Sequence, residues 1–207
     1  MLRFPAMTLA VLLCACGQGS SSATPTPSAA KLSTALTVTI PAARDDSAFT
    51  LQIAPDRTEI RMGDDVLIGQ GKDEKRFYRS AAGEAVLQIK NGDSAFKVRR
   101  PDGSLLWKVK ISDDKLKISD NEESTNAFVL KTKYDDKVKV LDAAEQALGE
   151  VKFKDASGKI KIVDAADQPV FELVGAKRSA AYGVALLRKI PPMQRAVIIA
   201  ELLAHGH

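Results

Sequence analysis

The feature that most constrains this chain is a repeat of 22 residues in its second half. Residues 137–150 align without gaps on residues 159–172, and a third copy starts at residues 115–120. Charged and apolar residues alternate within each copy, and this period of two places successive side chains on opposite faces of a β-strand. Each copy has room for two strands joined by a turn. The repeat therefore predicts a series of β-hairpins built side by side.

The same alternation extends beyond the repeat, over residues 36–174. Turn-forming pairs such as Asn91-Gly92, Asp113-Asp114 and Asp135-Asp136 separate its runs. We count about twelve to fourteen candidate strands, of which the N-terminal ones have the weakest pattern. The chain should be mainly β, with an antiparallel meander of about twelve strands.

The two faces of the repeat strands differ in kind. One face is the expected core: Trp107, Val109, Ile111, Leu116, Ile118, Val138, Val140, Val151, Phe153, Ile160, Ile162 and Phe171. The other face carries lysines: Lys108, Lys110, Lys115, Lys117, Lys137, Lys139, Lys152, Lys154, Lys159 and Lys161. One interpretation is a surface for anionic lipid, lipopolysaccharide or a polyanionic wall polymer. The other, which the sequence alone favours, is a solvated face whose lysines keep the sheet soluble.

The pattern changes from strand to helix after Val174. Ser179 is placed to cap a first helix over residues 180–189, and two prolines precede a second over residues 193–204. Because Glu201 is the only charged residue in the apolar part of the second helix, this helix should be buried. We expect a closed or nearly closed barrel with a buried apolar C-terminal helix or helix pair. An open sheet packed on the helices is the alternative.

This order of elements, hairpin strands followed by a very apolar C-terminal helix, resembles the tubby-like and LURP-one-related family over residues 36–204. The resemblance implies a closed barrel that encloses the helix. Some members of that family bind phosphoinositide headgroups through basic surface residues. No residue of this chain matches a motif of the family, so no binding residue is carried over.

The N-terminus has the parts of an export signal. Arg3 gives a positive start, residues 4–13 form an apolar run of signal-peptide length, and no apolar run is long enough to span a bilayer. The sequence Leu13-Cys14-Ala15-Cys16 resembles the bacterial lipobox, in which the last cysteine receives the lipid. We therefore expect lipidation of Cys16. An ordinary secretory leader or a redox pair of cysteines is the alternative.

The residues behind Cys16 are rich in Ser, Thr and Pro and contain no large apolar side chain, so they should form a tether. The expected location is the bacterial cell envelope, and in a Gram-negative host Gly17 favours the outer membrane. The chain then divides into a signal peptide (1–15), a lipidated cysteine with its tether (16–35), and one β-rich domain (36–207) with hairpin repeats at 115–174 and helices at 179–204.

Residues that carry common chemistries are scarce. Both cysteines lie in the leader, and the only histidines, His205 and His207, fall in what should be a disordered tail. The paired aspartates lie at expected turns and lack the spacing of a calcium loop. No nucleophile, nucleotide or metal motif is present, and a formal net charge of +4 is too small to indicate nucleic acid.

The sequence thus predicts no catalytic residue, metal or cofactor, and leaves the oligomeric state open. The expected function is that of a membrane-attached envelope protein that binds or scaffolds a lipid, a glycan or another protein. Two alternatives remain: an envelope hydrolase that uses a carboxylate pair, and a purely structural surface protein.

Replacing Cys16 by Ser should move the protein from the membrane fraction to the soluble fraction, because a lipobox without its last cysteine receives no acyl chains. Cell fractionation followed by immunoblotting measures this. The matched change Cys14→Ser should leave the protein in the membrane fraction. Retention of the Cys16→Ser protein at the membrane would show that the anchor is assigned to the wrong residue.

Overall fold

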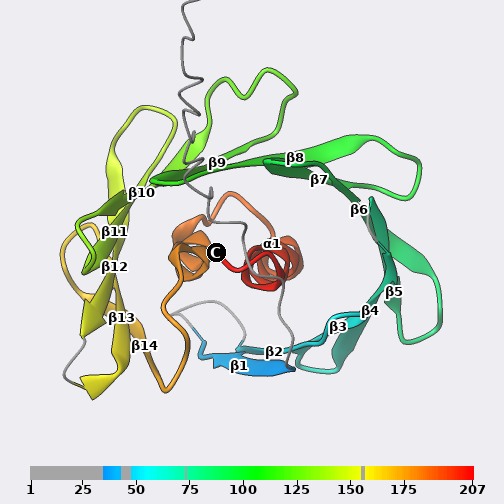
Figure 1. Ribbon diagram of the computed structural model, residues 1–207, viewed down its shortest axis with the longest axis horizontal. Helices are drawn as coiled ribbons and strands as arrows, with labels where there is room; N and C mark the ends of the chain where they lie inside the picture. Colours follow the sequence, from blue (N-terminus) through cyan, green and yellow to red (C-terminus); the bar gives the residue numbers. More distant parts are fainter. Residues whose placement is uncertain (1–34, 43–47, 73, 155–156) are drawn as a thin grey trace, which may run out of the picture.

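The computed structural model describes residues 35–42, 48–72, 74–154 and 157–207. Its strands form a single antiparallel sheet of fourteen strands, in which each strand pairs with the next along the chain. The sheet curls into a nearly closed barrel (Figure 1). The prediction of a mainly β meander barrel is confirmed, with fourteen strands instead of about twelve. The strands are β1 (Leu36–Ile40), β2 (Phe49–Ile53), β3 (Arg57–Met62), β4 (Asp65–Lys72), β5 (Lys75–Ser80), β6 (Ala85–Asn91), β7 (Ala95–Arg99), β8 (Leu105–Ser112), β9 (Lys115–Ser119), β10 (Phe128–Lys133), β11 (Lys137–Leu141), β12 (Ala147–Lys154), β13 (Lys159–Asp164) and β14 (Pro169–Val174).

The repeat corresponds to a recurring turn. Asp142, after β11, accepts hydrogen bonds from the backbone N–H groups of Ala144 and Gln146 at 2.9 and 2.8 Å. Asp164, 22 residues later, makes the same two contacts after β13. In both turns the backbone N–H of the aspartate donates to the carbonyl oxygen of the residue four positions later. The same backbone hydrogen bond follows β5, where the Ser80 N–H donates to the carbonyl oxygen of Glu84. The hairpin unit therefore extends further toward the N-terminus than the sequence comparison detected.

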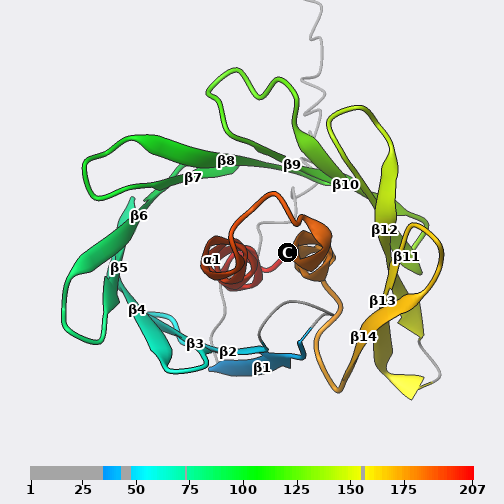
Figure 2. The same ribbon diagram turned by 180° about the vertical axis from the view of Figure 1, so that it is seen from behind.

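Two helical segments fill the barrel (Figure 2). A barrel of about eight strands can be filled by its own side chains, whereas wider barrels leave a space that something else must occupy. Helix α1 (Pro192–Ala204) supplies that filling, and it is buried on every side from Arg195 to Leu203. Its predicted burial is confirmed. No helix of the described residues has the length and hydropathy needed to cross a membrane.

The first predicted helix is shorter and tighter than expected. It is a 3-10 helix, η2 (Ala180–Leu186), and its N-cap Ser179 accepts a hydrogen bond from Ala181 N–H as predicted. It packs close to the wall, since a Cβ on Gly183 would lie only 2.9 Å from Val140 Cγ2. The expected continuation to residue 189 is wrong, because the backbone leaves the helical conformation at Leu187, where ψ is 73°.

The residues predicted to face inward from the repeat strands are confirmed as core residues with three exceptions. Most of the expected core residues are buried, but Trp107, Ile111 and Phe153 are only partly buried. Trp107 reaches α1, where its Nε1–H donates to Gln194 Oε1 at 2.6 Å. These three side chains line the margins of the core and not its middle.

One buried polar cluster ties α1 to the wall. The completely buried Glu201 accepts hydrogen bonds at Oε1 from Arg76 Nη1 at 2.9 Å and from Tyr78 Oη–H at 2.6 Å. Arg76 also donates to Thr58 Oγ1 at 3.1 Å. The Tyr78 ring lies over Gly69 of the neighbouring strand, where a Cβ would be 2.7 Å from the ring. Burial, followed by the charge of Glu201, raises the pKa of Tyr78 well above its ordinary value, so the hydroxyl stays protonated and donates.

Two buried tyrosines offer a matched test of this cluster. Replacing Tyr78 by Phe should lower the free energy of unfolding by ~2 kcal/mol, because it removes a hydrogen bond to a buried charge. Tyr182 is equally buried, which raises its pKa to about 12, and its hydroxyl has no hydrogen-bond partner among the described residues. Tyr182→Phe should therefore leave stability unchanged or raise it by up to ~1 kcal/mol. Urea unfolding compares the two, and equal losses would contradict the assignment.

Candidate functional site

The ten lysines predicted for the outer face all lie on the outside of the barrel, on β8, β9, β11, β12 and β13. Strand β10, which runs between β9 and β11, adds Lys131 and Lys133 to the same face. Sequence reasoning missed both residues, although residues 128–133 alternate in the same way. The reason is that the third copy of the repeat diverges in its second half, which is β10.

Strand register places these lysines directly opposite one another. Lys131 of β10 faces Lys115 of β9 on one side and Lys139 of β11 on the other. A second row lies two residues further along the strands: Lys133, Lys137, Lys152 and Lys161. Directly opposed like charges destabilise a sheet. The fold therefore maintains a charge arrangement that works against its own stability.

We call this surface the lysine wall and define it as Lys110, Lys115, Lys117, Lys131, Lys133, Lys137, Lys139, Lys152, Lys154, Lys159 and Lys161. Two of its members form ion pairs: Lys152 Nζ lies 2.5 Å from Asp167, and Lys137 Nζ lies 3.7 Å from Glu150. Lys139 and Lys161 face Glu150 and Glu172 across the strands without forming an ion pair. The hydrogen bond to Asp167 raises the pKa of Lys152. The other nine lysines form no ion pair with any other described residue.

Lys108, the remaining predicted residue, is in a different environment. Its Nζ lies 3.6 Å from Glu122, which also binds Lys97 at 2.7 Å and Arg99 at 3.1 Å. Hydrogen bonding from Lys97 is the main reason that the pKa of Glu122 is lowered. One carboxylate thus neutralises part of this cluster, and Lys108 does not belong to the lysine wall.

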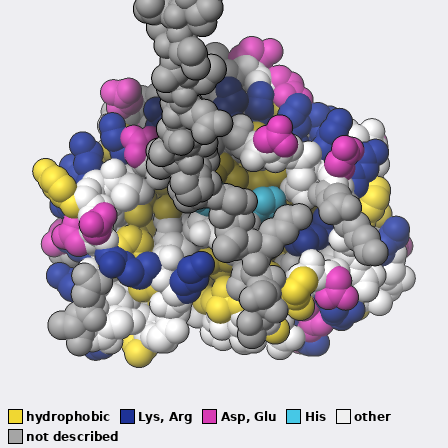
Figure 3. All heavy atoms as spheres, viewed as in Figure 1, with side chains coloured by type: hydrophobic (Ala, Val, Ile, Leu, Met, Phe, Trp, Pro, Cys, Tyr) yellow, Lys and Arg dark blue, Asp and Glu magenta, His cyan; other side chains and the backbone are white. Residues whose placement is uncertain are grey.

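Two exposed apolar side chains flank the lysine wall at one end of the barrel. Tyr134, in the turn between β10 and β11, is 83% exposed, and Val174, opposite Lys159 on β14, is 73% exposed. Tyr134 has a φ of 55°, a left-handed conformation that is uncommon outside glycine. Because all successive strands are antiparallel, β1 starts at the same end of the barrel. In the view along the barrel, basic side chains surround the rim and hydrophobic ones lie nearer its centre (Figure 3).

The remaining predicted positions have mixed outcomes. Cys16 lies outside the described residues. The expectation of a disordered tail at His205 and His207 is wrong: His205 stacks on Phe96 with ring centroids 5.8 Å apart, and His207 is held through its carbonyl oxygen by the Ser179 hydroxyl. Within the part of the chain that the structure describes, no three His, Cys, Asp or Glu side chains gather as a metal site would need.

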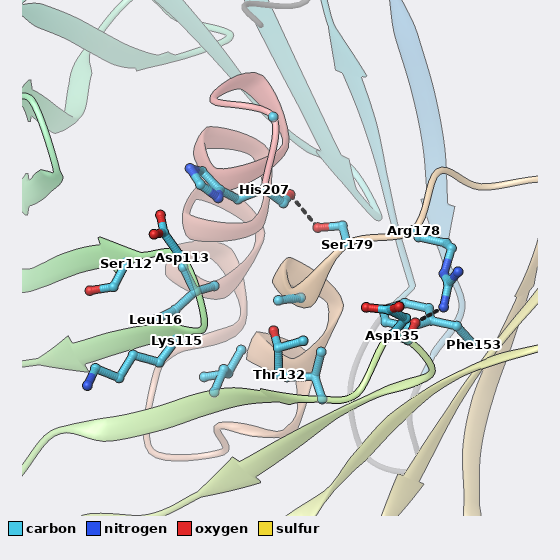
Figure 4. A pocket seen from close by; sticks show the side chains of 14 residues that line it. Ser112, Asp113, Lys115, Leu116, Thr132, Asp135, Phe153, Arg178, Ser179 and His207 are labelled. Atoms are coloured by element: carbon cyan, nitrogen blue, oxygen red, sulfur yellow. Dashed lines mark hydrogen bonds between the residues drawn. The ribbon is translucent and has the colours of Figure 1, made fainter. Parts of the chain in front are cut away.

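Asp113-Asp114 and Asp135-Asp136 lie in turns, as predicted, whereas the pair at 64–65 spans a turn and the first residue of β4 and the pair at 45–46 lies outside the described residues. Asp113 and Asp135 border a cavity at the same barrel end (Figure 4). Asp113 comes from the β8–β9 turn and Asp135 from the β10–β11 turn. Both are exposed. The figure shows Asp113 beside His207 and Asp135 beside Arg178, so the two carboxylates occupy different sides of the opening.

Comparison of the chain with protein-family models, curated protein sequences and solved structures found no match.

Because the lysines repel one another, removing one of their charges should stabilise the fold. Lys131→Gln removes the central charge of a three-lysine row and should raise the free energy of unfolding by ~0.5 kcal/mol at low salt. The gain should shrink as salt screens the repulsion. Lys97 also lies between two lysines, Lys90 and Lys108, but it is paired with Glu122, so Lys97→Gln should be neutral or slightly destabilising. Thermal unfolding at two salt concentrations compares them, and a loss of stability in Lys131→Gln would contradict the repulsion.

Proposed function

We propose that this protein is a non-catalytic, lipid-anchored protein of the bacterial envelope whose lysine wall binds an anionic membrane surface. The observation that carries the proposal is a set of nine lysines that form no ion pair with another described residue and are kept in opposed rows despite their repulsion. A partner with many negative charges would relieve that repulsion on binding. A purely structural surface would gain nothing from it.

The dimensions of the lysine wall favour a surface over a single anion. Neighbouring lysines in a row are about 4.8 Å apart across the strands, and successive rows are about 6.8 Å apart along them. Such a two-dimensional array presents its charge to a surface and not to a single point. Each lysine near an anionic bilayer contributes about 1 kcal/mol of attraction. The exposed Tyr134 fits the same role, because tyrosine is enriched where protein meets the membrane interface.

The lipid anchor and the lysine wall support each other in this proposal. Acyl chains on Cys16 would hold the barrel at the bilayer, and the wall would orient it there. Anchors that combine acyl chains with a basic patch bind membranes more stably than one signal alone. Outer-membrane location and relation to the tubby-like family stay predictions, as does the alternative of a carboxylate hydrolase.

Vesicle binding tests the proposal. Residues 17–207 contain every buried core residue that the structure describes and lack the leader. This chain should bind vesicles of equal parts phosphatidylcholine and phosphatidylglycerol at low salt, and should not bind phosphatidylcholine alone. Lys131→Gln with Lys139→Gln should weaken binding by roughly 30-fold, as expected for two lysines at about 1 kcal/mol each.

The matched control changes Lys75 and Lys90 to Gln. These two are also opposed lysines on neighbouring strands, but they lie on β5 and β6, away from the lysine wall. Their loss should change binding by less than about threefold. Cosedimentation measures both variants. Absence of salt-sensitive binding to anionic vesicles, or an equal loss in the two variants, would refute the proposal.

A further inference from the structure

A cavity of about 290 Å³ opens at the barrel end that carries Tyr134, between η2 and the wall (Figure 4). Its floor is apolar and buried, formed by Leu116 of β9, Leu130 of β10 and Val138 of β11. Ala180, the first residue of η2, lies across from them. A single water needs only about 10–15 Å³ of such space, so the cavity has room for a ligand of several heavy atoms.

The depth of the cavity is set by η2. One turn further along this helix, Gly183 comes so close to the wall that a Cβ would meet Val140 and Leu130 side chains at 2.9 and 3.0 Å. The interior is closed from there on. Phe153 forms a side of the opening, and the Arg178 guanidinium lies 4.7 Å above its ring. A ligand could therefore enter from the barrel end and would stop at η2.

The rim carries charges of both signs. Among the residues that line the cavity, Asp113 and Asp135 bring carboxylates and Arg178 a guanidinium, while the Lys115 side chain points away from the opening toward the lysine wall (Figure 4). Burial is the main reason that the pKa of His207 is lowered, so this ring is uncharged at neutral pH. An anionic or a cationic headgroup would meet a like charge at this rim. An uncharged headgroup would meet donors and acceptors of both kinds.

We propose that this cavity binds a single-chain amphiphile with an uncharged, hydroxyl-bearing headgroup. The apolar chain occupies the floor at Leu116, Leu130 and Val138, and the headgroup remains at the rim near the hydroxyl of Thr132. This arrangement follows the usual character of ligand sites, an apolar cavity with a few polar groups that fix orientation. The inference concerns a site separate from the lysine wall and holds whether or not that wall binds membranes.

Calorimetric titration of residues 17–207 with 1-O-decylglycerol, below the concentration at which it forms micelles, tests the inference. Decanoate and decyltrimethylammonium are the anionic and cationic comparison probes of equal chain length. We expect saturable binding of decylglycerol and binding roughly tenfold weaker or more for both charged probes. Thr132→Trp and Ala180→Phe each place a large side chain in the cavity and should weaken decylglycerol binding by a similar factor.

Thr37→Trp, on the exposed outer side of β1, is the matched control and should bind like the unchanged protein. Thr132 is itself exposed at the rim, so its replacement keeps the core intact if the Ala180 variant fails to fold. No binding of decylglycerol, or equal binding in the Thr132→Trp and Thr37→Trp proteins, would overturn the inference. A preference for decanoate that is lost with Lys131→Gln and Lys139→Gln would also overturn it and would assign the binding to the lysine wall.

Discussion

The fold depends on filling the inside of a fourteen-stranded sheet. A sheet that wide encloses more space than its own side chains can occupy, and the apolar helix α1 takes up the remainder. A purely apolar helix would fit at several depths and rotations. The buried Glu201 removes that freedom, because its carboxylate is costly to bury unless Arg76 and Tyr78 reach it together. We interpret this cluster as the contact that fixes where α1 sits.

With the core set by inward side chains, the outward positions are free of structural demands. The first strands show what such freedom allows: Thr50 faces Arg61 and Gln52 faces Glu59 across β2 and β3, a mixed polar surface. The barrel therefore does not need lysine opposite lysine. Lysine also faces lysine from β5 to β8, where Glu122 neutralises part of the row. On β9 to β13 most of the opposed lysines form no ion pair with another described residue, which costs stability through repulsion. The origin of that arrangement is better sought in what the surface contacts than in how the chain folds.

Sequence periodicity was sufficient for the β-hairpins, the buried C-terminal helix and most outward lysines, because all three are local patterns. It could not predict the contacts that form only when the barrel closes and brings distant parts of the chain together. Glu201 meets Arg76 across 125 residues of chain, and no local pattern specifies that pair. Burial of Phe153 and the order of His207 also depend on position near the barrel end. Lys131 was within reach of sequence reasoning, since β10 alternates in phase, but it lies in the divergent half of a repeat.

An even number of strands in a meander has a topological consequence. The chain enters β1 and leaves β14 at the same end of the barrel, and the return through η2 and α1 brings His207 back to that end as well. Tyr134 and the cavity lie there too. A lipid on the segment before β1 would therefore be attached at this end of the barrel and not at the opposite one. Because the number of strands is even, the proposed anchor, one end of the lysine wall and the cavity opening all lie at the same end of the barrel.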